Sequence, residues 1–167
     1  MIETRRLIIK PLTGDQLKKY ANFPNELADD LGLVPPSVLM ADEVKDAIQN
    51  DLLPKMTDPT KDPLYHTMWL IVEKSRSAII GGICFHGEPD EYGEVEIGYG
   101  IDEPFQNRGY MSETITGFTH WIIGNKKVKV IKAETGSDNI ASVRVLEKNG
   151  FKISQQIDGT LLFKLKL

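Results

Sequence analysis

Residues 94–113 decide the fold and read EVEIGYGIDEPFQNRGYMSE. Acidic and apolar side chains alternate from Glu94 to Ile97, which predicts a strand with one buried face. A short loop containing Gly109 follows, and the apolar spacing from Met111 onward has the period of a helix. We therefore expect a strand, a glycine loop and a helix in direct succession.

Such a loop can bind an anion. The first N–H groups of a helix have no partner within the helix, and the helix dipole places partial positive charge there. A phosphate or pyrophosphate suits that position, where Gly109 permits close approach, Arg108 adds charge and Ser112 offers a hydroxyl. Similar loops also connect strands to helices in proteins where no phosphate binds, so an anion site and a plain connection both stay open as interpretations. The loop lacks the Gly-Lys-Ser/Thr of a Walker loop and the three glycines of a dinucleotide fingerprint.

Two glycines interrupt the strand before this loop. Gly98 and Gly100 flank Tyr99 in an expected central strand, where glycine often marks a bulge. We expect a bulge here that separates the strand from its next neighbour. The freed peptide groups of Tyr99 and Ile101 could then pair with an extended amide ligand. Together with a pyrophosphate site, this favours coenzyme A, which carries a pantetheine arm.

The rest of the chain predicts a mixed α/β class and one domain spanning residues 1–167. Thr13, with Gln16 three residues later, indicates a capped helix start. Asp158-Gly159 indicates the turn of a closing hairpin. The expected strands are 7–11, 65–73, 78–86, 94–101, 127–133, 151–155 and 160–167; the expected helices are 13–20, 111–124 and 139–148, with helical turns in 25–30 and 41–53.

Residues 106–111, QNRGYM, resemble the Gln/Arg-x-x-Gly-x-Gly/Ala acetyl-CoA signature of the GNAT N-acetyltransferase superfamily. Residues 134–151, ETGSDNIASVRVLEKNGF, are similar to that family's second conserved block. The opening ETRRL at 3–7 resembles the branch of ribosomal-protein N-terminal (alanine/serine) acetyltransferases. The resemblance covers the whole chain. It implies a central, mostly antiparallel twisted sheet of about seven strands with about four helices, splayed at the acetyl-CoA site.

The resemblance further implies acetyl transfer from acetyl-CoA directly to a primary amine, without a covalent enzyme intermediate. Met111 replaces the last signature Gly/Ala but keeps its backbone N–H. Leu146 stands near the position of the family's general-acid tyrosine, which puts tyrosine-assisted protonation in doubt. The expected cofactor-binding residues are Tyr99, Ile101, Gln106, Asn107, Arg108, Gly109, Tyr110, Met111, Ser112 and Asn139.

Three residues are candidates for catalysis. A carboxylate can accept the amine proton directly or through water, and we favour Glu96 first and Glu103 second. Glu94 shares a strand face with Glu96, and each of these carboxylates also fits a solvated or ion-paired role. Ser142 could hydrogen-bond the departing sulfur or a pantetheine amide, although it also fits a plain small residue on a helix face.

Composition excludes several classes of function. The 167 residues hold 20 basic and 24 acidic side chains, a net charge of −4, which disfavours nucleic-acid binding. One cysteine, Cys84, excludes an internal disulfide and a cysteine-based zinc site. The three histidines show no metal-ligand spacing, so no metal is expected. Signal-peptide and membrane-helix patterns are missing from the sequence, which predicts a cytoplasmic protein without membrane contact.

The acceptor is not readable from the sequence. A small-molecule amine and a protein N-terminus both stay open, and residues 21–63 are expected to shape the acceptor site. Two other classes are weighed beside the enzyme: a non-catalytic acyl-CoA sensor on the same fold, and an interaction module whose loop is purely structural. The last strand, Leu161–Leu167, is expected to be exposed and to offer an edge for a homodimer.

Overall fold

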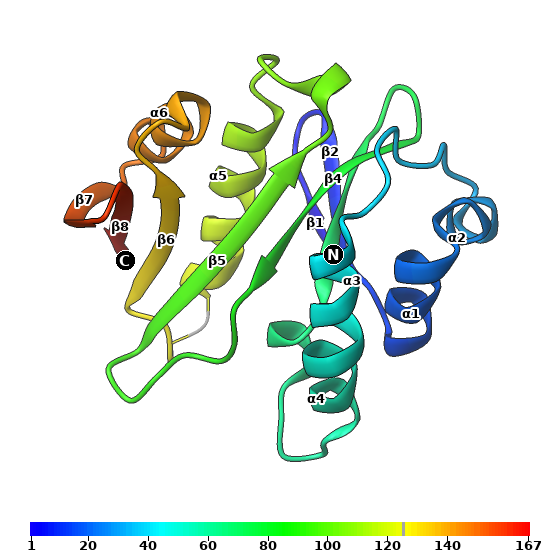
Figure 1. Ribbon diagram of the computed structural model, residues 1–167, viewed down its shortest axis with the longest axis horizontal. Coiled ribbons are helices and arrows are strands. Elements are labelled where there is room, and N and C mark those ends of the chain that lie inside the picture. The colour runs from blue at the N-terminus through cyan, green and yellow to red at the C-terminus, as the bar shows by residue number, and fades with distance from the viewer. Residues whose placement is uncertain (125) are drawn as a thin grey trace.

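The computed structural model describes residues 1–124 and 126–167 as an open eight-stranded sheet with helices on both faces (Figure 1). The strand order is β1-β2-β3-β4-β5-β6-β8-β7. Every neighbouring pair is antiparallel except β5 and β6, which are parallel. The strands are β1 (Ile2–Glu3), β2 (Leu7–Pro11), β3 (Met68–Glu73), β4 (Ala78–Phe85), β5 (Glu94–Ile101), β6 (Val130–Gly136), β7 (Lys152–Ile157) and β8 (Thr160–Lys166).

The helices are α1 (Gly14–Asn22), α2 (Pro24–Leu31), α3 (Asp42–Ala47), the π-helical η1 (Ile48–Leu52), α4 (Leu53–Thr57), α5 (Tyr110–Ile123) and α6 (Ile140–Lys148). Short 3₁₀ turns, η2 (Pro63–Tyr65) and η3 (Glu103–Phe105), precede β3 and α5. Since α3, η1 and α4 follow one another without a break, they form one helical run. The expected mixed α/β architecture is confirmed, and β1 adds a strand to the seven expected.

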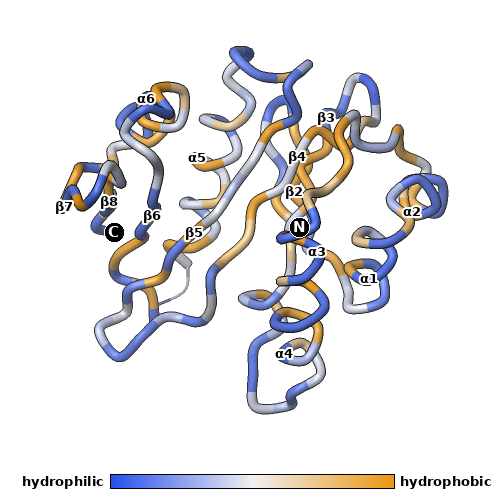
Figure 2. Tube along the Cα trace, in the orientation of Figure 1, coloured by the Kyte–Doolittle hydropathy of each residue, from blue (hydrophilic) through white to orange (hydrophobic). Residues whose placement is uncertain are grey.

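Each face of the sheet buries its own hydrophobic core. One core joins the sheet to α5 and α6 through Trp69, Phe85 and Phe118. The other joins it to α1, α2 and η1 through Leu17 and Ile48. Figure 2 shows the corresponding concentration of apolar residues in the central strands. A strand covered on both faces reads as a continuous apolar run, as β3 does.

Strands β5 and β6 separate after a short paired stretch. Their register runs from Glu94–Val130 to Glu96–Lys132, and in Figure 1 the two strands diverge beyond it. From Ile97 to Ile101, β5 therefore pairs with β4 on one side and leaves its other edge free. The expected splay is confirmed at this position.

The expected bulge at Gly98 and Gly100 is wrong. The β4–β5 register is continuous through both glycines, and the register shift in this meander lies between Ile71 and Val72 of β3. Gly98 instead makes room for the ring of His86, since a Cβ there would lie 2.5 Å from His86 Nε2. The splay comes from the divergence of β6, so it needs no extra residue in β5.

The last strand is not an edge, in contrast to our expectation. β8 pairs with β6 on one side and with β7 on the other, which makes β7 the edge strand. The β7–β8 turn is confirmed, with positive φ angles of 46° at Asp158 and 82° at Gly159. No helix in the described ranges has the length and apolar character to cross a membrane.

Candidate functional site

A cleft of about 430 Å³ opens at the free edge of β5, between the start of α5 and the side of α6. Nine of the ten expected cofactor-binding residues line it: Tyr99, Ile101, Gln106, Asn107, Gly109, Tyr110, Met111, Ser112 and Asn139. The candidate catalytic residue Ser142 lines it as well. The sequence reasoning missed Phe105 and the α6 residues Ile140, Ala141, Arg144 and Val145, whose signal was the helical spacing that follows Asn139.

The start of α5 forms one end of the cleft. Gly109 occupies the N-cap position with a left-handed φ of 76°, and no side chain caps the helix there. Asn107 is also left-handed, with a φ of 58°. Because the first N–H groups of a helix lack intrahelical partners, this end presents donors and partial positive charge to the cleft.

Two loop side chains act on the loop itself. Gln106 Nε2 donates to the carbonyl oxygen of Ile101 over 3.0 Å, which closes the loop. Arg108 is exposed and is not among the residues that line the cleft. Its guanidinium lies 5.9 Å from the Phe105 ring centroid, and its carbonyl accepts a hydrogen bond from Arg6 Nη1.

A pair of hydroxyls spans the cleft from β5 to α6. Tyr99 Oη and Ser142 Oγ are 2.9 Å apart. Asn139 caps α6, because its side chain accepts a hydrogen bond from Ser142 N over 3.1 Å. Burial raises the pKa of Tyr99, while its hydrogen bond with Ser142 acts in the opposite direction. The Ser142 hydroxyl is thus held at the free edge of β5 by a neutral phenol.

Asn149 ties the two helical walls together. Its Nδ2 donates to Ser112 Oγ over 3.1 Å, and its Oδ1 accepts from Thr116 Oγ1 over 2.7 Å. The same Nδ2 also donates to the carbonyl of Val145 in α6. These bonds hold the end of α6 against the first turns of α5 and so fix the width of the cleft.

The carboxylate favoured as the base lies on β5 but outside the cleft lining. Glu96 Oε1 is 2.7 Å from His86 Nδ1. Hydrogen bonding to Cys84 and to the Glu96 carboxylate outweighs burial and raises the pKa of His86 to about 9. No sequence motif marks this grouping, because His86 and Glu96 meet only where β4 pairs with β5.

The other two carboxylates differ in their surroundings. Glu94 pairs with Lys164 at 2.7 Å and with Lys132 at 3.5 Å, and the hydrogen bond from Lys164 outweighs desolvation in lowering its pKa. This places Glu94 in an ion-paired network between β5, β6 and β8. Glu103 is exposed on η3 and, like Glu96, is not among the cleft-lining residues.

A groove of about 170 Å³ lies on the opposite face of the sheet and shares Gly100 with the cleft. Its wall comes largely from residues 36–44, within the segment expected to shape the acceptor site. Gly81, Gly82 and Gly100 belong to its lining, together with the polar side chains of Tyr20 and Asp102. Burial, followed by the charge of Asp102, raises the pKa of Tyr20 to about 12.

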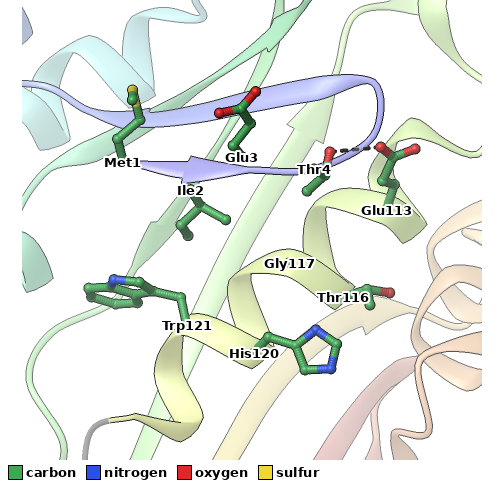
Figure 3. Close-up of a pocket in the computed structure, with 9 residues that line it drawn as sticks. All are labelled: Met1, Ile2, Glu3, Thr4, Glu113, Thr116, Gly117, His120 and Trp121. Carbon is green, nitrogen blue, oxygen red and sulfur yellow. Dashed lines mark hydrogen bonds between the residues drawn. The ribbon is translucent and has the colours of Figure 1, made fainter.

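A third cavity, of about 590 Å³, lies between β1 and α5 (Figure 3). Both of its carboxylates have partners: Glu113 accepts a hydrogen bond from Thr4 Oγ1 over 2.7 Å and pairs with Arg6, and Glu3 pairs with Lys74. The cavity therefore belongs to the packing of the N-terminus on α5. Within 1–124 and 126–167, no group of three or more His, Cys, Asp or Glu side chains could hold a metal ion.

The family model described as "Acetyltransferase (GNAT) domain" matches residues 6–152. The chain belongs to the GNAT acetyltransferase family. Among curated proteins, it is 35% identical over 88 residues to "Uncharacterized N-acetyltransferase YjdG" of Bacillus subtilis (strain 168). The match covers 53% of this chain and 52% of that relative, so the GNAT chain spans about half the length of this relative.

Solved structures share the fold at low identity. The ribosomal-protein-S5-alanine acetyltransferase from Vibrio fischeri superposes with a TM-score of 0.69 at 18% identity, covering 98% of this chain and 94% of that one. RimL, a ribosomal L7/L12 alpha-N-protein acetyltransferase in complex with coenzyme A, gives 0.67 at 16% identity, covering 98% and 96%. A GNAT acetyltransferase from Bacillus anthracis gives 0.64 at 18%, covering 99% and 97%. The likeness confirms the GNAT fold for the whole chain.

Proposed function

We propose that this GNAT chain is an N-acetyltransferase that moves an acetyl group from acetyl-CoA directly to a primary amine. The observation that carries the proposal is the cleft itself. A free strand edge leads straight to an uncapped helix start within it, and the family's acetyl-CoA signature occupies that helix start.

The residues present fit acetyl-CoA. At the edge of β5 that β6 vacates, Tyr99 and the N–H of Ile101 can form ladder hydrogen bonds with the amides of pantetheine, while the Ile101 carbonyl accepts from Gln106. The N–H groups at Gly109, Tyr110 and Met111 can hold the pyrophosphate, because a helix start favours negative charge. Arg108 adds positive charge from the exposed side of this loop, and Gln106 fixes the loop's return to β5.

Acetyl-CoA supplies the acetyl thioester that the amine attacks. Ser142 Oγ would donate a hydrogen bond to the leaving sulfur, and the Tyr99 hydroxyl would hold Ser142 in that orientation. Leu146 is fully buried in the hydrophobic core, so the family's usual tyrosine position contributes no acid here. In this proposal Ser142, held by Tyr99 of β5, is the group that hydrogen-bonds the leaving sulfur instead of a tyrosine.

We propose Glu96 as the group that accepts the amine proton, ahead of Glu103. By the alternation of β5, Glu96 lies on the strand face opposite Tyr99 and beside the first free positions of the splay. Its carboxylate is held by His86, whereas Glu103 is exposed on η3. Geometry comes before pKa in assigning a base, and Glu96 has the more defined position.

The acceptor is proposed to enter through the groove on the second face of the sheet, because that groove and the cofactor cleft meet at Gly100. A protein N-terminus is one acceptor class, by analogy with the structural neighbours that are ribosomal-protein acetyltransferases. A small primary amine is the other class.

Calorimetric titration with acetyl-CoA tests the cofactor. Ser112 lines the cleft in the first turn of α5, so Ser112→Glu puts a carboxylate where the pyrophosphate would bind. The substitution should not destabilise the helix, because a helix start favours negative charge. We expect saturable binding by the native protein, a loss of at least about tenfold in Ser112→Glu, and a change within about threefold in Ser112→Ala. The absence of binding by the native protein would overturn the proposal.

Acetyl transfer is tested separately by mass spectrometry of products. Peptides beginning with Ser or Ala and a panel of small primary amines are incubated with acetyl-CoA, and CoA release is followed. An acetylated amine supports the enzyme. Binding of acetyl-CoA without any transfer would instead favour the acyl-CoA sensor.

A further inference from the structure

We propose that Arg6 is a positioning residue that holds the pyrophosphate-binding loop of this protein in its binding conformation. Arg6 directly precedes β2 and lies about a hundred residues from the loop in sequence. The inference rests on the proposed binding of acetyl-CoA and adds to it a residue outside the signature at 106–111. It concerns the affinity for the pyrophosphate end of the cofactor, not the acetyl-transfer step.

One guanidinium contacts Arg108 in the loop and Tyr110 at the start of α5, and it lies beside Gly109 between them. Arg6 Nη1 donates to the carbonyl oxygen of Arg108 over 3.0 Å. Its central carbon lies 4.4 Å from the ring centroid of Tyr110, in cation–π geometry. Between these two contacts, Nη2 lies 3.5 Å from the position of a Cβ on Gly109. The guanidinium thus lies against the residues whose N–H groups begin α5.

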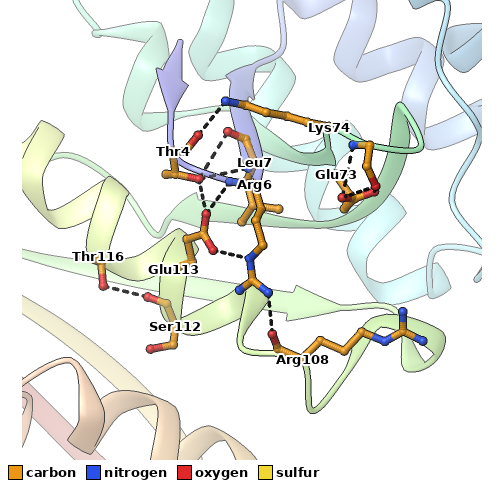
Figure 4. A network of polar contacts seen from close by, with 10 residues as sticks. Thr4, Arg6, Leu7, Glu73, Lys74, Arg108, Ser112, Glu113 and Thr116 are labelled. Atoms are coloured by element: carbon orange, nitrogen blue, oxygen red, sulfur yellow. Dashed lines mark hydrogen bonds and ion pairs between the residues drawn. The ribbon is translucent and has the colours of Figure 1, made fainter.

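The other side of Arg6 is anchored to α5 itself (Figure 4). Arg6 Nε donates to Glu113 Oε2 over 2.7 Å, and Arg6 N donates to Glu113 Oε1 over 2.8 Å. Thr4 Oγ1 donates to the same Oε1 over 2.7 Å. The two side chains of the ion pair are 31% and 18% exposed, so solvent screens this contact less than a surface pair.

Burial opposes the ionisation of Glu113, but the hydrogen bonds from Thr4 and Arg6 outweigh it and lower its pKa. Glu113 is therefore ionised at neutral pH, and its charge in the first turn of α5 also favours the helix. Arg6 consequently has a fixed anchor on α5 from which it can reach the loop.

The loop needs such a support. Asn107 and Gly109 both have left-handed backbones, with φ angles of 58° and 76°. Asn107 adopts a conformation that is uncommon for a residue with a side chain. A loop that is ordered before the ligand arrives loses less freedom on binding, which raises affinity without adding a ligand contact. Arg6 supplies that order from the bend that directly precedes β2.

Lysine cannot replace this arrangement. The contacts to Glu113, Arg108 and Tyr110 use the planar fork and the stacking face of a guanidinium, which an ammonium lacks. The neighbouring Arg5 is exposed and offers a matched control with the same charge. A role that depended on net charge alone would affect both positions equally.

The test compares thioesters with and without the pyrophosphate. Native protein, Arg6→Ala, Arg6→Lys and Arg5→Ala are assayed with acetyl-CoA and with S-acetylpantetheine, and ADP is titrated calorimetrically as a pyrophosphate probe. We expect Arg6→Ala to raise the KM for acetyl-CoA and the Kd for ADP at least about tenfold, or about 1.4 kcal/mol. The kcat/KM for S-acetylpantetheine should stay within about twofold. Arg6→Lys should recover little, and Arg5→Ala should match the native protein.

Equal losses with both thioesters, or unchanged affinities in Arg6→Ala, would overturn the inference. Arg6→Ala leaves Glu113 without its ion pair, so the double variant Arg6→Ala/Glu113→Gln provides a second folded background, checked by its melting temperature. It should show the same selective loss for ADP and acetyl-CoA. Failure of the native protein to bind CoA would instead count against the proposed function.

Discussion

The cofactor cleft and the groove behind it meet at Gly100, but they are built in different ways. Most of the cleft lining comes from one stretch of chain between residues 99 and 112, and Asn139 and α6 supply the rest. The groove collects Tyr20, residues 36–44, Met68 and the glycines of β4 from separate parts of the chain. The cleft therefore depends on local backbone geometry, and the groove depends on how the strands and helices pack.

This difference matters for function. A helix start and a free strand edge present backbone donors and acceptors whatever the side chains are, so one cofactor site can persist in divergent sequences. A groove formed by scattered side chains takes its shape from each of them. The acceptor side is accordingly where GNAT proteins with the same cofactor can differ.

The largest effect is expected where the two regions share a wall. Gly81 has a φ of 153°, and a Cβ there would overlap the carbonyl oxygen of Gly100. Gly81→Ala should reduce the free energy of unfolding by about 2–4 kcal/mol, because backbone strain and overlap add. Urea denaturation measures this. Gly14→Ala, which meets open space at the start of α1, should stay within about 0.5 kcal/mol of the native value. A Gly81→Ala variant with the native free energy of unfolding would show that the backbone around Gly81 and Gly100 can shift to make room for the Cβ.

A smaller effect, confined to the cleft, is expected at the hydroxyl pair. Ser142→Ala should lower kcat by about 10- to 100-fold if this hydroxyl assists the leaving sulfur, and the Kd for acetyl-CoA should change little. Tyr99→Phe removes the partner that holds Ser142, so its loss in kcat should be smaller. The comparison requires full kinetics with the acetylated amine found by screening. A Ser142→Ala variant with native kcat would remove Ser142 from the mechanism.

The smallest effect is expected on the second face, at the His86–Glu96 pair. The pKa of folded His86 is raised to about 9 from 6.5, first by hydrogen bonding to Cys84 and then by Glu96. Protonated His86 therefore stabilises the fold fully below pH 6.5, and this stabilisation is lost as the pH rises through 9. His86→Asn should therefore lower the melting temperature by about 1–3 °C more at pH 6 than at pH 10. The expected difference is small because the ion pair is partly exposed to solvent, which weakens it. His120→Asn, an exposed histidine elsewhere, is the control. An equal shift at both pH values would contradict this.

The cleft could be anticipated in detail because its signals are local. The sequence predicted the strand, the loop and the helix in order, and nine of the ten residues expected to bind the cofactor line the cavity. It also predicted the Thr13–Gln16 capping box of α1, which the hydrogen bonds confirm. Caps, turns and helix starts depend on residues within one turn of each other, so a pattern in the chain is enough to locate them.

The two wrong predictions, the bulge in β5 and the edge position of the last strand, have the opposite cause, because they depend on contacts between distant parts of the chain. Gly98 and Gly100 indicated a bulge, but the structure uses the absence of a Cβ at Gly98 to seat His86 from the next strand. The terminal residues indicated an edge strand, but β7 occupies the edge and β8 lies inside the sheet. Both depend on which strands are neighbours, and the sequence of one strand does not state its partner.

The sequence alone determined the family, the order of most elements and the place where α5 begins, since these follow from short-range geometry and from a motif of adjacent residues. The tertiary structure decided which distant groups meet. It brought Arg6 and Glu113 to the loop, Ser142 to Tyr99 and His86 to Glu96. Those encounters depend on sheet register and helix packing, which balance contacts over the whole chain and leave no local signature at either partner.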